Sequence, residues 1–206
     1  IFEKDKLSCS LIVVCDDNDP LIKKEEFHST SKDYHQTAFT FIFNSKEGFF
    51  DKASQFFYED SILALLPLKS NEIGVVWSCN EQLKKHLESL DEKELVNYLQ
   101  NRIDRKFLIE IPLKQKNMFA LKDKYFKSIL SKRLVLIGDA AHKIHPMAGQ
   151  GLNLGLRDLR YFEEIISSAH NCDFGDINFL RKYERRRRKD VSQFLNLTSI
   201  LSDLIF

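Results

Sequence analysis

The stretch from Arg133 to Asp158 constrains the fold of this chain more than any other part of it. It reads RLVLI and then GDAAHKIHPMAGQGLNLGLRD. A β-branched and apolar run that ends at a glycine is typical of a short buried strand. Beyond the later glycines, apolar residues recur at helical spacing, at Leu152, Leu156, Leu159, Phe162, Ile166 and Ala169. We therefore predict a strand, a loop and a helix that begins near Gly149 to Gly151, an order typical of α/β proteins.

The residues of this loop favour a polyol or an anion as ligand. Asp139 follows the predicted strand, and α/β sheets bind ligands at the carboxyl ends of parallel strands. Its carboxylate can accept hydrogen bonds from sugar or ribitol hydroxyls. Gly149, Gln150 and Gly151 leave room for a ligand to approach the backbone, and the N–H groups at a helix start attract negative charge. A phosphate and the anionic edge of a reduced flavin ring fit such a helix start equally well.

The chain before this loop is predicted to form strands and two short helices. Leu11 to Cys15 is a continuous apolar run typical of a buried strand. From Gln36 to Trp77, the segments QTAFTFIF, FFYEDSILALLPL and IGVVW predict an antiparallel sheet. Leucines spaced among charges predict two helices within 81–105. Residues 107–113 and 118–121 read as extended again, and 122–131 as a short polar segment.

A further helix is predicted after Asp176, which has the side chain of an N-cap. Its apolar positions are Leu180, Tyr183, Val191, Phe194, Leu201 and Ile205. The same helix carries a basic run from Arg185 to Lys189. A charge run on a helix is usually a solvated face, and we prefer that interpretation to contact with an anionic membrane surface.

Composition limits the class of partner. The chain has 206 residues, of which 43% are hydrophobic, so it can bury a core. Its 31 Lys and Arg nearly balance 30 Asp and Glu, which gives no electrostatic case for nucleic acid. Four scattered cysteines without a CxxC pair indicate buried thiols in a reducing compartment. No apolar run approaches the roughly 20 residues of a membrane span. We expect a cytoplasmic protein, either soluble or peripheral to the inner membrane.

The loop residues match a known family. Gly138 to His142, His145-Pro146 and Gly149 to Gly155, followed by Asp158, resemble the second FAD-binding motif of class A flavoprotein monooxygenases. Within that group the tract is most similar to the ubiquinone-biosynthesis hydroxylases. The LLPL and VVW segments upstream extend the resemblance over nearly all of the chain. It implies an α/β fold with an α+β substrate sheet, as in the C-terminal part of a para-hydroxybenzoate-hydroxylase-like FAD-binding fold.

The resemblance also implies an activity and a set of site residues. Such enzymes use FAD, reduced by NAD(P)H or a related donor, to activate molecular oxygen and hydroxylate a phenolic ring. The implied cofactor-binding residues are Gly138, Asp139, Pro146, Gly149, Gln150, Gly151, Leu152 and Asn153. Asp139 would hold the ribitol, Gly149 to Asn153 would face the pyrimidine edge, and Pro146 is the one catalytic candidate, beside the oxygen-reacting face. The implied substrate is a polyprenylated phenol, and its lipid tail implies membrane proximity or a biosynthetic complex.

On this basis we expect four segments. Residues 1–21 would be a return strand of the FAD-binding domain, and 22–120 a mixed substrate-binding sheet. Residues 121–170 would form the FAD-binding strand, loop and helix, and 171–206 a C-terminal helical segment. The opening residues read as a strand already under way within a larger fold.

Two departures from the family pattern bear on the cofactor. No GxGxxG strand-turn-helix occurs in this sequence, so the motif that would bind the ADP half of FAD is missing. The family's middle DG motif reads Asp16-Asp17, where a second carboxylate would repel a pyrophosphate and a positive φ would be strained. We therefore expect these 206 residues alone not to retain FAD. The alternative function is a noncatalytic remnant or assembly subunit of the same fold without flavin.

Other chemistry-bearing residues have simpler explanations. His142 and His145 lie near Asp139 in the sequence, but no fourth ligand is evident, so we predict no metal site. We expect His142 to brace the loop instead. The Phe56-Phe57-Tyr58 cluster and Trp77 have the chemistry of an aromatic pocket, yet aromatic residues in strands more often belong to the core.

Overall fold

The computed structural model describes residues 8–46, 51–69, 71–103, 109–144, 151–170 and 172–205. The chain divides into two compact units. The first contains residues 1–32 and 122–199, and the second contains residues 33–121 and 200–206. Two long strands, β2 (Ser29–Ser45) and β6 (Ile109–Phe126), run from one unit into the other.

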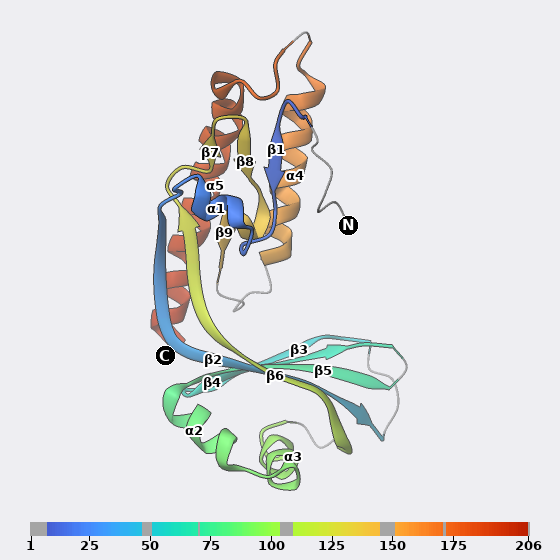
Figure 1. Cartoon of the computed structure of the whole chain (residues 1–206). Helices are drawn as coiled ribbons and strands as arrows, with labels where there is room; N and C mark the ends of the chain where they lie inside the picture. Colours follow the sequence, from blue (N-terminus) through green and yellow to red (C-terminus); the bar gives the residue numbers. More distant parts are fainter. Residues whose placement is uncertain are drawn as a thin grey trace. The chain divides into compact units, whose positions relative to one another are not determined.

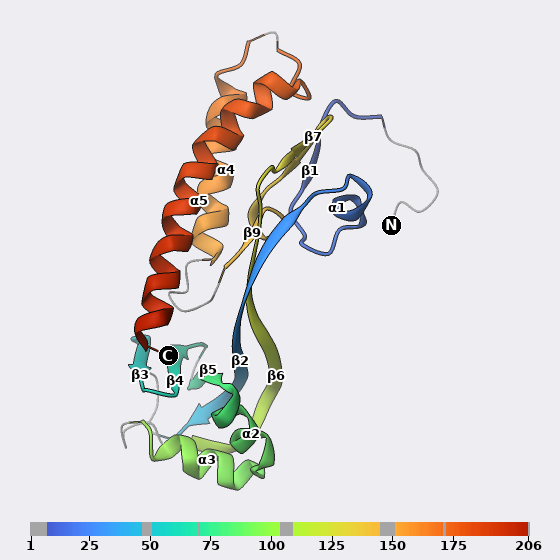
Figure 2. The same ribbon diagram turned by 90° about the vertical axis from the view of Figure 1, so that its left-hand side faces the viewer.

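The first unit is built on a three-stranded sheet of order β1-β8-β7. Strand β8 (Leu134–Leu136) lies in the centre, parallel to β1 (Ile12–Val14) and antiparallel to β7 (Leu130–Ser131). Helices α4 (Gly151–Ser167) and α5 (Ile177–Ile205) lie side by side along one face, and α1 (Pro20–Lys24) lies on the other (Figure 2). The core contains all of β8 together with Phe162, Leu180 and Tyr183.

The second unit is mainly an antiparallel sheet. Strands β3 (Ser54–Phe57), β4 (Ser61–Pro67) and β5 (Glu72–Asn80) join β2 and β6 in the order β3-β4-β5-β2-β6. The end of β6 that belongs to the first unit pairs there with β9 (His142–Lys143). Helices α2 (Glu81–Ser89) and α3 (Glu92–Gln100) cover one face (Figure 1). Trp77, Phe43 and Leu63 from the strands pack with Leu83 and Leu99 from the helices.

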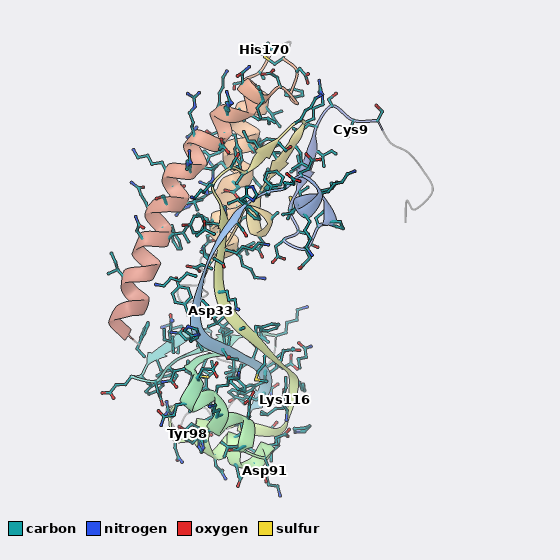
Figure 3. The ribbon with its side chains drawn as sticks, turned by 60° about the vertical axis from the view of Figure 1, so that its left-hand side comes forward. Cys9, Asp33, Asp91, Tyr98, Lys116 and His170 are labelled. Carbon is teal, nitrogen blue, oxygen red and sulfur yellow. The ribbon has the colours of Figure 1, made fainter. Side chains whose placement is uncertain are left out.

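Capping residues define where α2 and α3 begin. The Asn80 side chain accepts the Leu83 amide, and Asp91 and Glu94 form a reciprocal capping box at α3. Lys116 of β6 forms an ion pair with Glu92 in the first turn of α3, so strand and helix are joined. Figure 3 labels Lys116 and the capping residue Asp91.

Several predictions from the sequence are confirmed. The fold is α/β, 36–80 is dominated by antiparallel strands, and 81–105 contains two short helices. The segment after Arg133 forms β8, a 3-10 turn at Gly138–Ala140 (η1) and a helix that starts at Gly151. The Asp176 side chain accepts the amides of Asn178 and Phe179, which confirms it as the cap of α5.

Other predictions are wrong in detail. Residues 122–126, read from the sequence as part of a short polar segment, belong to β6, and this end of the strand pairs with β9. Ile12 and Val13 are exposed, because β1 is the edge strand of a small sheet, and only Val14 of this strand is buried. Cys9, Cys15 and Cys172 are also exposed, and only Cys79 is a buried thiol. Burial raises the pKa of Cys79 to about 12.

The buried face of α4 also differs from the expected one. Leu152, Leu156 and Leu159 are 75%, 52% and 51% exposed, whereas Leu154, Asp158 and Phe162 are buried. The side of α4 that contains Asp158 faces the interior, because this carboxylate has its partners there.

Candidate functional site

The loop after β8 is a tight turn that presents Asp139. Gly138 has a φ of +61°, a conformation that side chains other than glycine rarely adopt. The Ile137 amide donates to Val14 O at 2.9 Å and the Ala140 amide to Cys15 O at 3.3 Å, so the turn lies beside the end of β1. Asp139 lies in this turn and is exposed, and no described residue forms a hydrogen bond or ion pair with its carboxylate.

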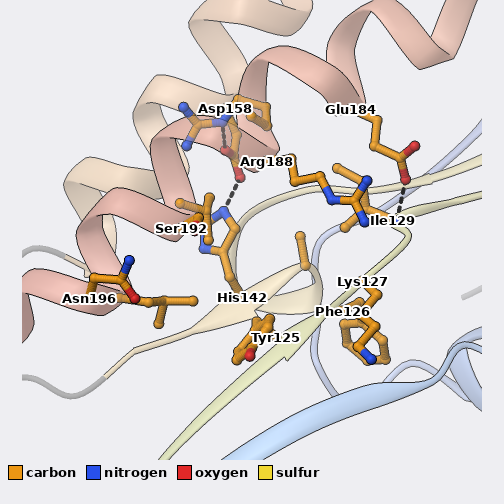
Figure 4. A pocket seen from close by; sticks show the side chains of 14 residues that line it. Tyr125, Phe126, Lys127, Ile129, His142, Asp158, Glu184, Arg188, Ser192 and Asn196 are labelled. Carbon is orange, nitrogen blue, oxygen red and sulfur yellow. Dashed lines mark hydrogen bonds and ion pairs between the residues drawn. The ribbon is translucent and has the colours of Figure 1, made fainter. Parts of the chain in front are cut away.

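The turn is fixed by the buried carboxylate of Asp158. Its Oδ2 accepts the Gly138 amide at 2.7 Å. Figure 4 shows two further contacts: Oδ2 hydrogen-bonds to His142 Nε2 at 2.8 Å, and Oδ1 accepts Arg187 Nε. Asp158 comes from α4 and Arg187 from α5. One carboxylate therefore joins both helices to the loop that carries Asp139.

The environment of Asp158 favours its ionised form. Burial is the largest influence and opposes ionisation, but hydrogen bonds from His142 and the Gly138 amide and the charges of His142 and Arg187 outweigh it. The pKa of Asp158 therefore lies below its ordinary value. Arg187 also donates to Asp190 Oδ2 at 2.5 Å and to Leu154 O at 3.4 Å, so its guanidinium is satisfied within the interior.

Asp17 does not carry the backbone strain expected at the glycine position of the DG motif. It is not among the described residues with positive φ, so the strain that a positive φ would cause does not arise. Its carboxylate accepts Lys143 Nζ at 3.0 Å. Because Lys143 is a cation beside Asp17, the repulsion expected for an approaching anion is reduced.

The structure describes part of the site proposed from the sequence. Gly138 and Asp139 lie in the turn, and Gly151, Leu152 and Asn153 form the first turn of α4. Pro146, Gly149 and Gln150 lie outside the described residues, as does His145. The hydrogen bond from Gly138 to Asp158 ties the turn to α4 one residue before Asp139.

Arg187 is the important residue that sequence reasoning missed. The basic run was interpreted as solvated, but Arg187 is 1% exposed. It stands on the apolar stripe of α5 formed by Leu180, Tyr183 and Val191, at helical spacing. A single arginine on an apolar stripe is a signal for a buried acidic partner.

The aromatic residues singled out in the sequence lie in different environments. Trp77 is fully buried in the core, as expected, while Phe57 is exposed. Tyr58 packs on Arg102, with its ring centroid 5.0 Å from Cζ. Within the described ranges, no group of three or more His, Cys, Asp or Glu residues could hold a metal ion. No described helix has the length and apolar character needed to cross a membrane.

Comparison with curated proteins finds relatives whose names refer to ubiquinone hydroxylation or biosynthesis. Ubiquinone hydroxylase UbiL of Rhodospirillum rubrum is 30% identical over 170 residues, which are 82% of this chain and 40% of that protein. Ubiquinone biosynthesis monooxygenase COQ6 of Danio rerio is 26% identical over 220 residues, or 89% of this chain and 46% of that protein. The chain therefore spans less than half the length of these two relatives.

Solved structures and a family comparison agree with this fold. HpxO of Klebsiella pneumoniae, solved with FAD and uric acid, matches with a TM-score of 0.68 and 16% identity, over 95% of this chain and 51% of that chain. A family described as FAD binding domain matches residues 3–198. Because this match covers nearly the whole sequence, the chain belongs to the FAD-binding family of class A flavoprotein monooxygenases.

Proposed function

We propose that this chain supplies the flavin end of the FAD site in a monooxygenase that hydroxylates an aromatic ring. The observation that carries the proposal is the exposed carboxylate of Asp139, directly after a central strand and on a turn fixed to α4. An ionised carboxylate without a partner among the described residues is suited to accept hydrogen bonds from ribitol hydroxyls.

The first turn of α4 is suited to contact the pyrimidine edge of the flavin ring. Gly151, Leu152 and Asn153 begin a helix of 17 residues, whose N-terminal amides carry partial positive charge. These amides would stabilise negative charge on the pyrimidine edge, and Gly149 and Gln150 are proposed to extend the same contact. Pro146 is proposed to lie beside the reactive face. FAD, when bound, would supply the redox chemistry that activates oxygen, with NAD(P)H as the proposed reductant.

An apolar phenol is the proposed substrate. Ile73, Val75 and Trp77 of β5 point toward the core under α2 and α3, so Gly74, Val76 and Ser78 point to the opposite face. The register sets Ile42 and Thr40 of β2 and Ala64 of β4 beside them. This sheet face has small side chains without charge, and all but Ser78 and Thr40 are apolar, which supports binding of an uncharged ring with a hydrocarbon tail. The names of the ubiquinone-related relatives point to the same class, and such a tail would bring the protein close to a membrane or a biosynthetic complex.

The test is oxygen incorporation by the native protein. It would be supplied with FAD, NADH or NADPH, labelled dioxygen and one of two phenols that differ only in a polyprenyl tail. We expect mass spectrometry to find one labelled oxygen in the prenylated product and much less in the tailless one. Exclusive turnover of small charged phenols would contradict the substrate class. Bound FAD with neither reduction nor labelled product would favour a noncatalytic protein.

A further inference from the structure

Helix α5 carries a group of exposed cations in the first unit. The helix lies beside α4, and its Leu180, Tyr183 and Arg187 are buried in the interior (Figure 2). Successive residues of a helix point about 100° apart, so residues between these buried positions point to the solvent side. Five exposed cations within nine positions share that side, and we call them the basic face: Arg181, Lys182, Arg185, Arg188 and Lys189.

The basic face differs from its neighbours on α5 in having no acidic partner. Arg186 and Arg187 belong to the same run, and they form ion pairs with Glu164 and Asp158 of α4. No member of the basic face forms an ion pair with a described residue, and Arg185 donates only to a main-chain oxygen one turn earlier. The charge of the basic face is therefore available to a partner.

The acidic residues nearest in sequence do not cancel this charge. Glu184 accepts Ser128 Oγ at 2.8 Å and the Ile129 amide at 2.9 Å, and Asp190 accepts a hydrogen bond from Arg187. Even if both carboxylates are counted in full against the five cations, three net positive charges remain on the basic face. The whole chain has a net charge of only +1, so positive charge is concentrated here.

The composition of the basic face favours a lipid surface over a protein as its partner. Stable protein interfaces are centred on buried aromatic or aliphatic side chains. The exposed positions that continue the basic face along α5 are Ser192, Gln193 and Asn196, so it contains no such centre. An anionic lipid surface needs none, because each nearby Lys or Arg strengthens binding about fivefold through charge alone. This choice also rests on the proposed function, since a phenol with a hydrocarbon tail lies in a lipid bilayer.

We propose that the basic face of α5 binds the surface of a bilayer that contains anionic phospholipids. The lipid phosphates pair with the guanidinium groups of Arg181, Arg185 and Arg188, whose planar donors match phosphate oxygens. No side chain of the basic face enters the hydrocarbon, so the binding is electrostatic and reversible. The sequence alone favoured a solvated face for this run, and the structure limits that interpretation by showing which of its cations lack partners.

The test is sedimentation of the purified chain, without flavin, with vesicles of phosphatidylcholine alone or mixed with phosphatidylglycerol. We expect the chain to sediment with the mixed vesicles and not with the neutral ones. About 1 M salt should release it, because charges are then screened beyond about 3 Å.

Matched charge variants test the face itself. Arg185→Gln combined with Lys189→Gln should weaken binding to the mixed vesicles more than tenfold, by about fivefold for each charge. Lys85→Gln combined with Lys93→Gln removes the same charge from exposed positions on α2 and α3, and should change binding by less than about twofold. Glutamine is a good helix former, so both double variants should keep the unfolding midpoint of the wild type.

Equal affinities of the two double variants would overturn the proposal, as would binding to neutral vesicles or binding that survives high salt. Failure to sediment with mixed vesicles, together with binding to poly-L-glutamate through the basic face, would assign the face to an acidic protein instead. The measurement needs neither flavin nor phenol. Vesicle binding without oxygen incorporation would therefore contradict the proposed function alone, and oxygen incorporation without vesicle binding would contradict this inference alone.

Discussion

The two units each contain an Asp–Arg pair, and the pairs differ in burial. In the first unit, the side chains of Asp158 and Arg187 are 0% and 1% exposed. In the second unit, Asp60 and Arg102 are 34% and 20% exposed. The Asp60 pair has two hydrogen bonds of 2.7 Å, and Arg102 also packs over the rings of Tyr58 and Tyr98.

Because the two Asp–Arg pairs differ in burial, they have different structural roles. Water can partly replace Asp60 as a partner of Arg102, and the surrounding rings would keep the arginine in position. The side chain of Arg187 is only 1% exposed, so without Asp158 it would stay a largely buried charge with less compensation. The fully buried pair therefore determines the geometry of the loop that carries Asp139, whereas the partly exposed pair joins the β3–β4 turn to the end of α3.

The largest effect is expected from Asp158→Ala. It leaves Arg187 and His142 buried without their shared partner, so the free energy of unfolding should fall by about 3–5 kcal/mol. Chemical denaturation would measure the loss, and faster amide hydrogen exchange of Gly138 would locate it in the first unit. Asp158→Asn keeps the shape and should be milder. A loss of less than about 1 kcal/mol for the alanine variant would show that the burial of this pair has little consequence.

The pH dependence of stability sharpens the same comparison. The pKa of Asp158 is lowered in the fold, as described above, and the pKa of Asp60 is also lowered, mainly by its hydrogen bonds from Arg102. A lowered pKa contributes stability that is present above the unfolded value near pH 4 and is lost as the pH falls through the folded value. Unfolding free energy should therefore drop below about pH 4. Asp158→Asn should flatten this drop, and an unchanged slope would contradict the assigned ionisation.

A smaller effect is expected from Asp60→Ala. Because Arg102 keeps the hydroxyl of Tyr98 and access to water, the cost should be about 1–2 kcal/mol. Trp77 is the only tryptophan and is fully buried in the second unit, so its fluorescence reports this unfolding. Alkylation of the buried Cys79 should become faster as the sheet opens more often. A cost equal to that of Asp158→Ala would remove the distinction between the two pairs.

The smallest effect is expected from Asp173→Asn. Its pair with Arg133 also has two hydrogen bonds, but the side chains are 47% and 46% exposed. Exposed ion pairs gain little over hydration, so the denaturation midpoint should not change measurably. A clear shift would mean that bidentate geometry, rather than burial, decides the strength of these pairs.

Sequence patterns predicted the elements better than their faces. Strand β8 and the start of α4 were predictable because an apolar run and a glycine-rich loop are local signals. The exposure of Leu152, Leu156 and Leu159 was not, because the orientation of α4 depends on Asp158 and its distant partner Arg187. The two residues lie 29 positions apart and form their ion pair only in the folded chain. Periodicity on either helix alone cannot identify such a pair.

The sequence also predicted some residues of the proposed site but not their distant partners. The motif identified Asp139 and Gly138, and the left-handed conformation of Gly138 gives a physical reason for the glycine. The pairing of Asp17 with Lys143 could not be read from the sequence, because the residues are 126 positions apart. The contacts of Pro146, Gly149 and Gln150 remain predictions.

The central claim is that this chain contacts only the flavin end of FAD, and a comparison of FAD with riboflavin tests it most directly. Fluorescence quenching would give the affinities of both ligands for the purified chain and for Asp139→Ala. We predict weak binding, similar for the two ligands because no ADP-binding motif is present, and about tenfold weaker in the variant at unchanged unfolding free energy. Tight stoichiometric binding of FAD with a strong preference over riboflavin would contradict the account, as would absent riboflavin binding or equal affinities of wild type and Asp139→Ala.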